Sequence, residues 1–221
     1  LGNVICGVPQ GSILGPILFL IYVNGMPQAI KSKLLLYADD FCVLYQHKEV
    51  EAIEQQLNED FANLCDWFVD NKLSIHFGKN KTNSILFSTK GKVKKRDVLN
   101  ILYKNIEIKQ YSKVSYLGCI LDETFSGESM CLKVIEEINA KLRFLYRKNN
   151  YLTPALHRML CNAMIQPHFD PECLTLYTSL TKALKNKIQI TQNKCIRFCL
   201  NLGNLDHIGT KEFKKINWLN T

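Results

Sequence analysis

The chain has 221 residues, of which 47% are hydrophobic and 22% charged, a composition that is typical of one or two globular domains and excludes a predominantly disordered chain. Its longest apolar run, at 13–23, is interrupted by Gly15 and Pro16 and is well short of the ~20 residues that cross a bilayer, so no membrane span is expected. The net charge of +8 is uneven: positions 1–89 carry 6 basic and 9 acidic side chains, whereas positions 90–221 carry 22 and 11, so the downstream part is expected to hold a polyanion.

The first 30 residues predict a tight loop followed by a short helix. The loop, Gly7–Ser12, is bounded by glycines, and Pro16 stands where a helix can begin, just before the apolar run at 17–23. Asn24-Gly25 and Pro27 then end that helix.

A β-hairpin is predicted next. Two runs of strand-forming residues, at 34–38 and 41–45, are separated only by Asp39 and Asp40, which places two carboxylates at the hairpin tip. Turns accept aspartate readily, so an ordinary turn is the simplest interpretation of this pair alone. Two adjacent like charges nevertheless repel unless a cation compensates them, and Mg²⁺ prefers carboxylate oxygens. The pair is therefore a candidate Mg²⁺ site.

A long amphipathic helix is predicted over 49–70. Its acidic residues Asp60, Asp66 and Asp70 are expected on the solvated face. The apolar residues recur every three or four positions, at Val50, Ile53, Leu57, Phe61, Leu64 and Phe68.

Short strands are predicted after this helix, and helices alone beyond residue 125. The strands are expected at 73–75, 83–88 and 114–121, with a basic loop or exposed strand edge at 90–96. One downstream helix carries a stripe of Met130, Val134, Ile138, Leu142 and Leu145; a second begins at Pro154 and runs toward Gln166; a third spans 181–200. The chain thus divides into a mixed part, 1–125, and an all-helical part, 126–221.

Nine cysteines form an odd set without a CxxC pair, and most of them lie in apolar segments. This pattern favours reduced core thiols in an intracellular protein. Cys195 and Cys199 have the spacing to face a metal together with His207, but the absence of a second close pair disfavours a zinc site.

Several strings then occur in one order: Gly7–Pro16, Tyr37-Ala38-Asp39-Asp40, Asn71–Ser74 followed by Lys81-Thr82, and Tyr116-Leu117-Gly118. Together they resemble the palm of reverse transcriptases, and more narrowly that of jockey-type non-LTR retrotransposons. The segments 165–170 and 191–198 are similar to the helical region that follows the palm in those elements, so the resemblance extends over essentially the whole chain.

The resemblance implies an α+β fold, with a partial polymerase palm (an antiparallel sheet with helices on one face) followed by an all-helical, thumb-like region. The implied activity is RNA-directed DNA polymerase, with an RNA template, a DNA primer and deoxynucleoside triphosphates as partners, and with two Mg²⁺ ions as cofactors. Asp39 matches the family's metal-binding catalytic aspartate, and Asp40 matches its less stringent neighbour. The implied location is the nucleus or cytoplasm, and no membrane is involved.

Other positions are matched to the family one by one. The nucleotide and template side would be formed by Pro9, Gln10, Gly11, Tyr37, Ala38 and Lys81; for Lys81 a solvated turn lysine is the alternative. Tyr116, Leu117 and Gly118 match the primer grip, with an ordinary buried strand as the alternative. Contacts to a nucleic-acid backbone are expected from Lys133, Lys141, Arg143, Arg147 and Lys148, whose alternative is a solvated helix face.

Two departures from the family lead us to expect a fragment that is inactive alone. The family has a further catalytic aspartate on a strand upstream of the Gly7 loop, and fingers that hold template and nucleotide; neither is present in this sequence. The alternative is a non-catalytic nucleic-acid-binding remnant of a decayed element. An open strand edge beside residues 34–36 is expected to favour association between chains.

Overall fold

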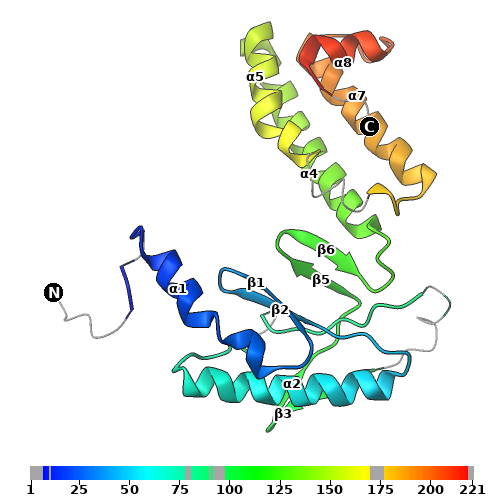
Figure 1. The fold of residues 1–221 in the computed structure, drawn as a ribbon. Helices are drawn as coiled ribbons and strands as arrows, with labels where there is room; N and C mark the ends of the chain where they lie inside the picture. The colour runs from blue at the N-terminus through cyan, green and yellow to red at the C-terminus, as the bar shows by residue number, and fades with distance from the viewer. Residues whose placement is uncertain are drawn as a thin grey trace. The chain divides into compact units, whose positions relative to one another are not determined.

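A computed structural model of the chain describes residues 7–9, 11–77, 81–89, 91, 98–169 and 177–218. The chain forms two compact units (Figure 1): an N-terminal unit, comprising residues 1–84 and 96–110, and a C-terminal unit, comprising residues 85–95 and 111–221. Helices and small antiparallel sheets are combined, which is an α+β fold. Among the described residues, no helix is both long and apolar enough to cross a membrane.

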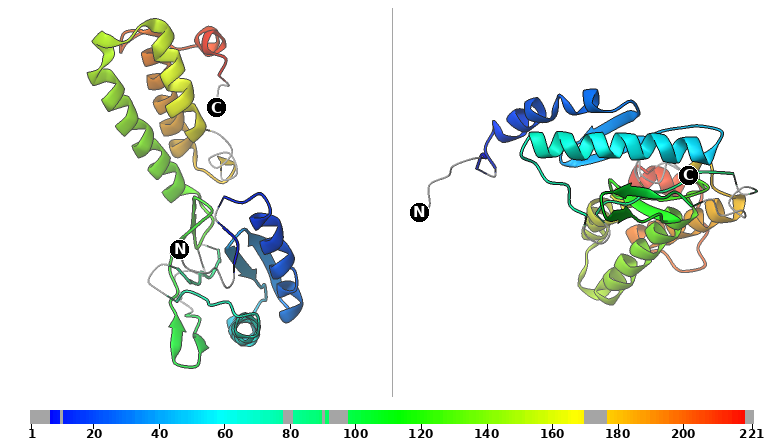
Figure 2. Two further views of the ribbon diagram at one scale, coloured as in Figure 1. Left: turned by 90° about the vertical axis from the view of Figure 1, so that its left-hand side faces the viewer. Right: turned by 90° about the horizontal axis from the view of Figure 1, so that it is seen from below.

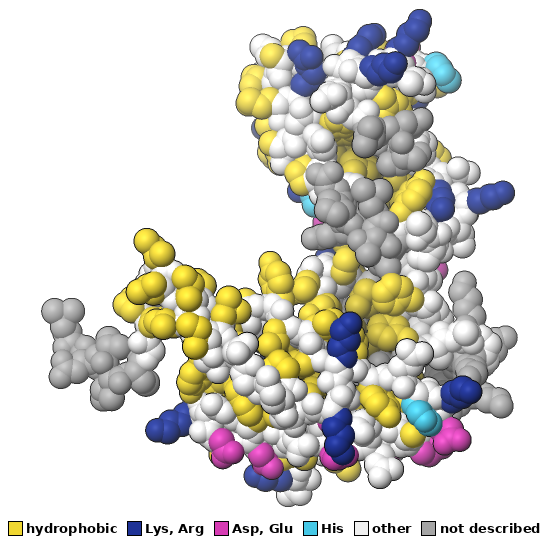
Figure 3. Space-filling model, in the orientation of Figure 1, with side chains coloured by type: hydrophobic (Ala, Val, Ile, Leu, Met, Phe, Trp, Pro, Cys, Tyr) yellow, Lys and Arg dark blue, Asp and Glu magenta, His cyan; other side chains and the backbone are white. Residues whose placement is uncertain are grey.

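Helix α1 (Gly15–Val23) opens the N-terminal unit as predicted, with proline in its first turn. The hydroxyl of Ser12 accepts a hydrogen bond from the backbone N–H of Gly15 at 3.1 Å and so satisfies one donor at the helix start. A short 3₁₀-helix, η1 (Met26–Ala29), follows. Figure 3 shows hydrophobic side chains gathered over α1, where Ile21 is 68% exposed.

Strands β1 (Lys33–Tyr37) and β2 (Asp40–Leu44) form the predicted hairpin, with a turn one residue earlier than expected. Tyr37 pairs with Asp40, so the two turn residues are Ala38 and Asp39. In this register Leu36 lies opposite Phe41, an apolar cross-strand pair that the predicted turn would have replaced with Ala38 opposite Phe41.

Helix α2 (Val50–Asp70) confirms the predicted amphipathic helix. Ile53, Phe61 and Leu64 of its stripe are buried. The inner face of the hairpin packs on this helix, and the rings of Phe41 and Phe68 lie 5.6 Å apart. The hairpin therefore has a hydrophobic support along one face.

The prediction that Asp60 lies on the solvated face of this helix is wrong. Its side chain is fully buried and accepts the backbone N–H groups of Lys31 and Ser32, at 2.9 and 3.2 Å. The amide of Gln56 donates to the same carboxylate at 3.2 Å. Asp60 thus fixes the segment that enters β1 to α2.

A second hairpin of the N-terminal unit, β3 (Ile101–Tyr103) with β4 (Ile106–Ile108), was not predicted. Polar side chains of α2 bind its backbone: the Asn58 amide donates to the Asn100 carbonyl at 2.9 Å and accepts from the Leu102 N–H at 2.8 Å. These side-chain partners replace a neighbouring strand, and strand propensity alone does not reveal them.

The predicted strands at 73–75 and 83–88 do not form in the described residues. The N–H of Leu73 donates to the Phe68 carbonyl at 2.8 Å, which ties this segment to the end of α2. In the second segment only Ser84 makes a bridge, to Gln110. The predicted basic loop at 90–96 lies outside the described residues, apart from Gly91.

In the C-terminal unit a hairpin forms where a single strand was predicted at 114–121. Strands β5 (Lys113–Tyr116) and β6 (Cys119–Asp122) pair antiparallel around Leu117 and Gly118. Both turn residues have positive φ, 47° and 84°, as a type I′ turn requires. Glycine at the second position accepts this conformation without strain, so the chain reverses there.

The described residues beyond β6 form helices joined by loops, and the three predicted helices are confirmed (Figure 2). The elements are α4 (Glu128–Arg147), η2 (Asn149–Tyr151), α5 (Pro154–Met164), η3 (Gln166–His168), α7 (Lys182–Leu200) and α8 (Thr210–Ile216). All five residues of the predicted α4 stripe are buried. Compact packing places the β5–β6 hairpin with these helices, while the predicted division of the chain at residue 125 stays a prediction.

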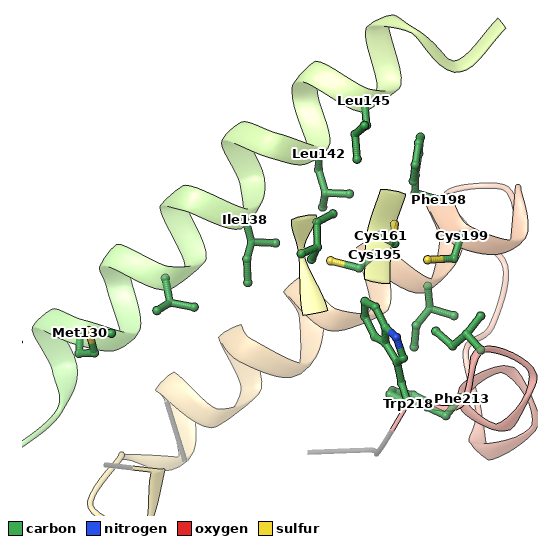
Figure 4. Packing of buried hydrophobic residues seen from close by; sticks show 14 residues of the cluster. Met130, Ile138, Leu142, Leu145, Cys161, Cys195, Phe198, Cys199, Phe213 and Trp218 are labelled. Carbon is green, nitrogen blue, oxygen red and sulfur yellow. The ribbon is translucent and has the colours of Figure 1, made fainter. Parts of the chain in front are cut away.

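The C-terminal core explains three of the downstream cysteines (Figure 4). Cys161, Cys195 and Cys199 are buried among Leu142, Phe198 and their neighbours. The thiol of Cys195 donates to the Thr191 carbonyl at 3.2 Å, and His207 is exposed on a loop. These cysteines therefore fill the core, as the preferred interpretation of the sequence had it.

Candidate active-site hairpin and basic pocket

The two candidate catalytic carboxylates lie at the tip of the β1–β2 hairpin. Asp39 is the second turn residue and Asp40 the first residue of β2, and both are exposed. Ala38, the first turn residue, has a φ of 50°, a left-handed conformation that alanine rarely adopts. Among the described residues, neither aspartate is joined to a partner by a hydrogen bond or ion pair. Both carboxylates are thus available to an external ligand.

The hairpin has one supported face and one open face. Leu34, Phe41 and Val43 pack toward α2. Because side chains alternate along a strand, Tyr37 and its cross-strand partner Asp40 lie on the opposite face. Tyr37 is 65% exposed there. An aromatic ring and a carboxylate therefore share the open face, next to the turn that carries Asp39.

The two carboxylates at this tip provide some, but not all, of the oxygen ligands that a divalent cation such as Mg²⁺ needs. Carboxylate oxygens are the ligands that Mg²⁺ takes from proteins, and it retains waters or substrate phosphates at its other positions. Within the described ranges, no group of three or more His, Cys, Asp or Glu side chains is placed to hold a metal ion. Asp39 and Asp40 can thus supply one side of a Mg²⁺ site, and further oxygen ligands must come from elsewhere.

The residues expected beside nucleotide and template are exposed where they are described. The N–H of Ser12 donates to the Pro9 carbonyl at 3.1 Å, which closes a turn in which Gly11 has a φ of 83°. Gln10 lies outside the described residues. Lys81 is exposed in a turn. The described members of this set thus lie on the surface of the N-terminal unit.

The three residues matched to a primer grip occupy the tip of the β5–β6 hairpin in the C-terminal unit. Leu117 is 42% exposed and Gly118 is exposed beside it, while Tyr116 is half-buried at the end of β5. The alternative of a plain buried strand is therefore wrong for Leu117 and Gly118, which form a turn. Their role in holding a primer stays a prediction.

The five cations expected along a nucleic-acid backbone are not one row of free charges. The Lys141 ammonium donates to the Met164 carbonyl at 2.9 Å and also contacts the His168 ring. It therefore connects α4 to the following helical segment. Arg143 instead lines a pocket on the α7 side. Of the other three, Lys133 is half-buried on α4, whereas Arg147 at the end of α4 and Lys148 just after it are exposed.

That pocket, of about 620 Å³, lies between α4 and α7 in the C-terminal unit and is basic. It is lined by Asn139, Leu142, Arg143, Tyr146, Lys194, Arg197 and Asn204. Lys194 and Arg197 were missed by the sequence reasoning, although their i,i+3 spacing on a predicted helix was a usable signal. Their proximity to Arg143 depends on the packing of α7 against α4.

Comparison with known proteins identifies the family of the chain. Residues 3–121, more than half of the chain, match the family described as reverse transcriptase (RNA-dependent DNA polymerase). The chain is 28% identical over 214 residues to the probable RNA-directed DNA polymerase from transposon X-element of Drosophila melanogaster. It is 25% identical over 212 residues to the RNA-directed DNA polymerase from mobile element jockey of Drosophila funebris.

A third relative is the retrovirus-related Pol polyprotein from type-1 retrotransposable element R1 2 of Nasonia vitripennis, 26% identical over 211 residues. These three alignments cover 88%, 86% and 87% of this chain but 22%, 21% and 50% of the relatives, so the chain spans about a fifth of the first two. No solved structure matches with comparable significance. The family match over residues 3–121 nevertheless confirms the resemblance found in the motifs, and the chain belongs to the reverse transcriptase family.

Proposed function

We propose that this chain is the part of a retrotransposon RNA-directed DNA polymerase that carries its catalytic hairpin. The observation that carries the proposal is the exposed pair Asp39 and Asp40 at the tip of a hairpin that α2 supports from behind. Family membership supplies the class of reaction, phosphoryl transfer to a DNA 3′ end. The substrates would be an RNA template, a DNA primer and deoxynucleoside triphosphates.

In this proposal Asp39 is the chief ligand of Mg²⁺ and Asp40 assists it. Mg²⁺ held by these carboxylates would activate the attacking 3′ oxygen and stabilise the departing pyrophosphate. The chain itself contributes placement. The β1–β2 ladder and the contact between Phe41 and Phe68 hold the tip, and this rigidity favours fixed carboxylates over mobile ones.

The neighbouring positions receive supporting roles in the same proposal. Tyr37 shares the open face with Asp40, which suits a ring beside a primer end or nucleotide. Ala38 keeps the turn small, and Gly11 allows the backbone to approach a ligand closely. Lys81 would face the leaving phosphates, and Leu117 with Gly118 would contact the primer.

The finer architecture is part of this proposal as well. The mixed part of the chain would be a partial palm, and the helices from α4 onward a thumb-like region that follows it. We also propose an intracellular location, either nuclear or cytoplasmic. Each of these assignments rests on the family match and on the order of the motifs.

A second candidate function is nucleic-acid binding without catalysis. Two observations favour it: within the described ranges only Asp39 and Asp40 are available as ligands at the hairpin tip, and the C-terminal unit has a basic pocket. The 221-residue chain alone is therefore expected to bind nucleic acid and not to extend a primer with Mg²⁺ or Mn²⁺.

The test is metal-dependent primer extension by a longer polypeptide that contains this chain together with the fingers and a further aspartate. Asp39→Asn should lower the extension rate by at least about 100-fold, because the carboxylate acts mainly in the transition state, and should leave nucleic-acid affinity nearly unchanged. Asp70→Asn, which removes an exposed carboxylate of α2, is the matched control and should retain full activity. A normal extension rate for the Asp39→Asn variant would refute the assignment of Asp39 as the chief Mg²⁺ ligand.

A further inference from the structure

The basic pocket between α4 and α7 favours nucleic-acid binding, and its lining indicates which form of nucleic acid it would take. Arg143 comes from α4 and Lys194 and Arg197 from α7, so three cations line one concavity. None of its lining residues is an aspartate or glutamate. In the part of the chain that the structure describes, no ion pair joins any of the three cations to a carboxylate. Like charges gathered without a counter-charge favour an anionic ligand.

Arg197 is oriented in advance for such a ligand. Its Nε and Nη2 groups both donate to the backbone carbonyl of Asp206, at 3.1 and 2.9 Å. A guanidinium carries five N–H donors, so several remain for a second acceptor. Because the side chain is already held, binding an oxyanion through it loses little rotamer freedom.

The pocket also offers an aromatic ring. Tyr146 is 44% exposed, and its ring packs against Phe198 in a T-shaped arrangement with centroids 4.9 Å apart. Phe198 is buried, so it fixes the Tyr146 ring at the pocket wall. The side-chain amides of Asn139 and Asn204 add hydrogen-bonding groups. A fixed ring beside clustered cations is the combination by which proteins bind unpaired nucleotides.

We propose that the α4–α7 pocket binds a segment of single-stranded nucleic acid, with a phosphate on Arg143, Lys194 and Arg197 and a base on Tyr146. The volume of about 620 Å³ suits a nucleotide-sized group. A base can stack on a protein ring only when it is unpaired, so a single strand is favoured over a duplex. The inference rests on the proposed function in one respect: it takes nucleic acid as the natural source of the phosphate.

The experiment is fluorescence anisotropy with the 221-residue chain and a labelled 12-nucleotide single strand, as DNA and as RNA. Arg143→Gln combined with Lys194→Gln should weaken binding at least about tenfold, and the slope of log K against log salt should become shallower by about 1.4. Neither side chain has a described hydrogen bond, so the fold should persist. Lys182→Gln combined with Lys211→Gln removes two exposed cations outside the pocket and should change affinity less than threefold.

Variants of Tyr146 test the contribution of base stacking separately from that of charge. Tyr146→Leu should weaken single-strand binding by about 5- to 100-fold and leave the salt slope unchanged, whereas Tyr146→Phe should restore affinity. Equal losses from the pocket and control double variants, or no loss from the pocket variant, would overturn the proposal. A plain anion site would instead give two results. Inorganic phosphate at millimolar concentration would displace the oligonucleotide, and Tyr146→Leu would leave the affinity for the oligonucleotide unchanged. Equal affinity for a duplex would likewise overturn the single-strand assignment.

These outcomes are independent of catalysis. A longer polypeptide that fails to extend a primer would count against the proposed function and leave the binding results standing. If the double variant Arg143→Gln, Lys194→Gln extended a primer normally and bound the oligonucleotide with unaltered affinity, the pocket proposal would be refuted. The proposed polymerase function would stand.

Discussion

The carboxylate of Asp60 on α2 accepts the backbone N–H of Lys31 at 2.9 Å, although 28 residues separate the two in sequence. The neighbouring N–H of Ser32 donates to the other carboxylate oxygen. This link joins α2, the helix that supports the β1–β2 hairpin, to the residues that enter β1. It therefore couples the stability of the N-terminal unit to the position of Asp39 and Asp40.

Replacing Asp60 with alanine should destabilise the N-terminal unit by about 3 kcal/mol, because the backbone N–H groups of Lys31 and Ser32 would lose their acceptor. Urea denaturation followed by circular dichroism measures this loss. Asp70→Ala changes an exposed aspartate of the same helix and should cost less than about 0.5 kcal/mol. Equal stabilities of the two variants would show that the Asp60 link contributes nothing.

Asp122 predicts a pH-dependent contribution to stability in the C-terminal unit. Burial raises the pKa of its carboxyl, but hydrogen bonds from the backbone and hydroxyl groups of Ser126 and Thr124 outweigh burial and hold the pKa below its ordinary 3.8. A depressed pKa stabilises the fold fully above the unfolded-state value and loses that effect as pH falls through the folded-state value.

Asp122→Asn should accordingly be less stable than the parent chain at pH 7, with a difference that shrinks as the pH is lowered from about 4 toward 2. Thermal unfolding measured across this range provides the comparison. Glu123→Gln alters the adjacent carboxylate, whose side chain has no described hydrogen bond, and should follow the parent at every pH. A difference for Asp122→Asn that is constant over the range would contradict the mechanism.

Three buried thiols should be unreactive in the folded chain. Burial, assisted by the charge of Asp66, raises the pKa of Cys65 to about 11. A hydrogen bond with Cys199 and then burial raise the pKa of Cys161, and burial raises that of Cys195. Since the thiolate is the nucleophile, iodoacetamide at pH 8 should label these sites only after unfolding in urea, as peptide mass spectrometry would reveal. Rapid labelling of the folded chain would contradict the described packing.

The exposed apolar surface of α1 should make the isolated chain associate. Ile17 and Ile21 are 52% and 68% exposed, and Ile13, just before the helix, is 90% exposed. Surfaces of this kind recruit other chains. Sedimentation velocity should show mass rising with concentration, and Ile17→Gln combined with Ile21→Gln should shift the chain toward monomer. Val69→Gln, on an exposed apolar residue of α2, is the control; a parent chain that is monomeric at all concentrations would refute the prediction.

The sequence by itself determined the elements whose signals are local. The stripe from Val50 to Phe68 predicted α2, and the stripe from Met130 to Leu145 predicted α4, because a helix repeats its buried face every three or four residues whatever lies opposite. The ordered motifs around Gly11, Asp39 and Tyr116 identified the family, because the order and spacing of motifs are read directly from the chain.

Only the tertiary structure decided what depends on partners distant in sequence. Asp60 is polar and was expected in solvent, but a buried carboxylate is stable where backbone donors converge on it, and those belong to Lys31 and Ser32. Strand β3 is held by Asn58 of α2, a partner that no strand propensity encodes. Arg143 and Lys194, which are 51 positions apart in sequence, line one pocket because α4 and α7 pack through their apolar faces and leave both cations at the surface.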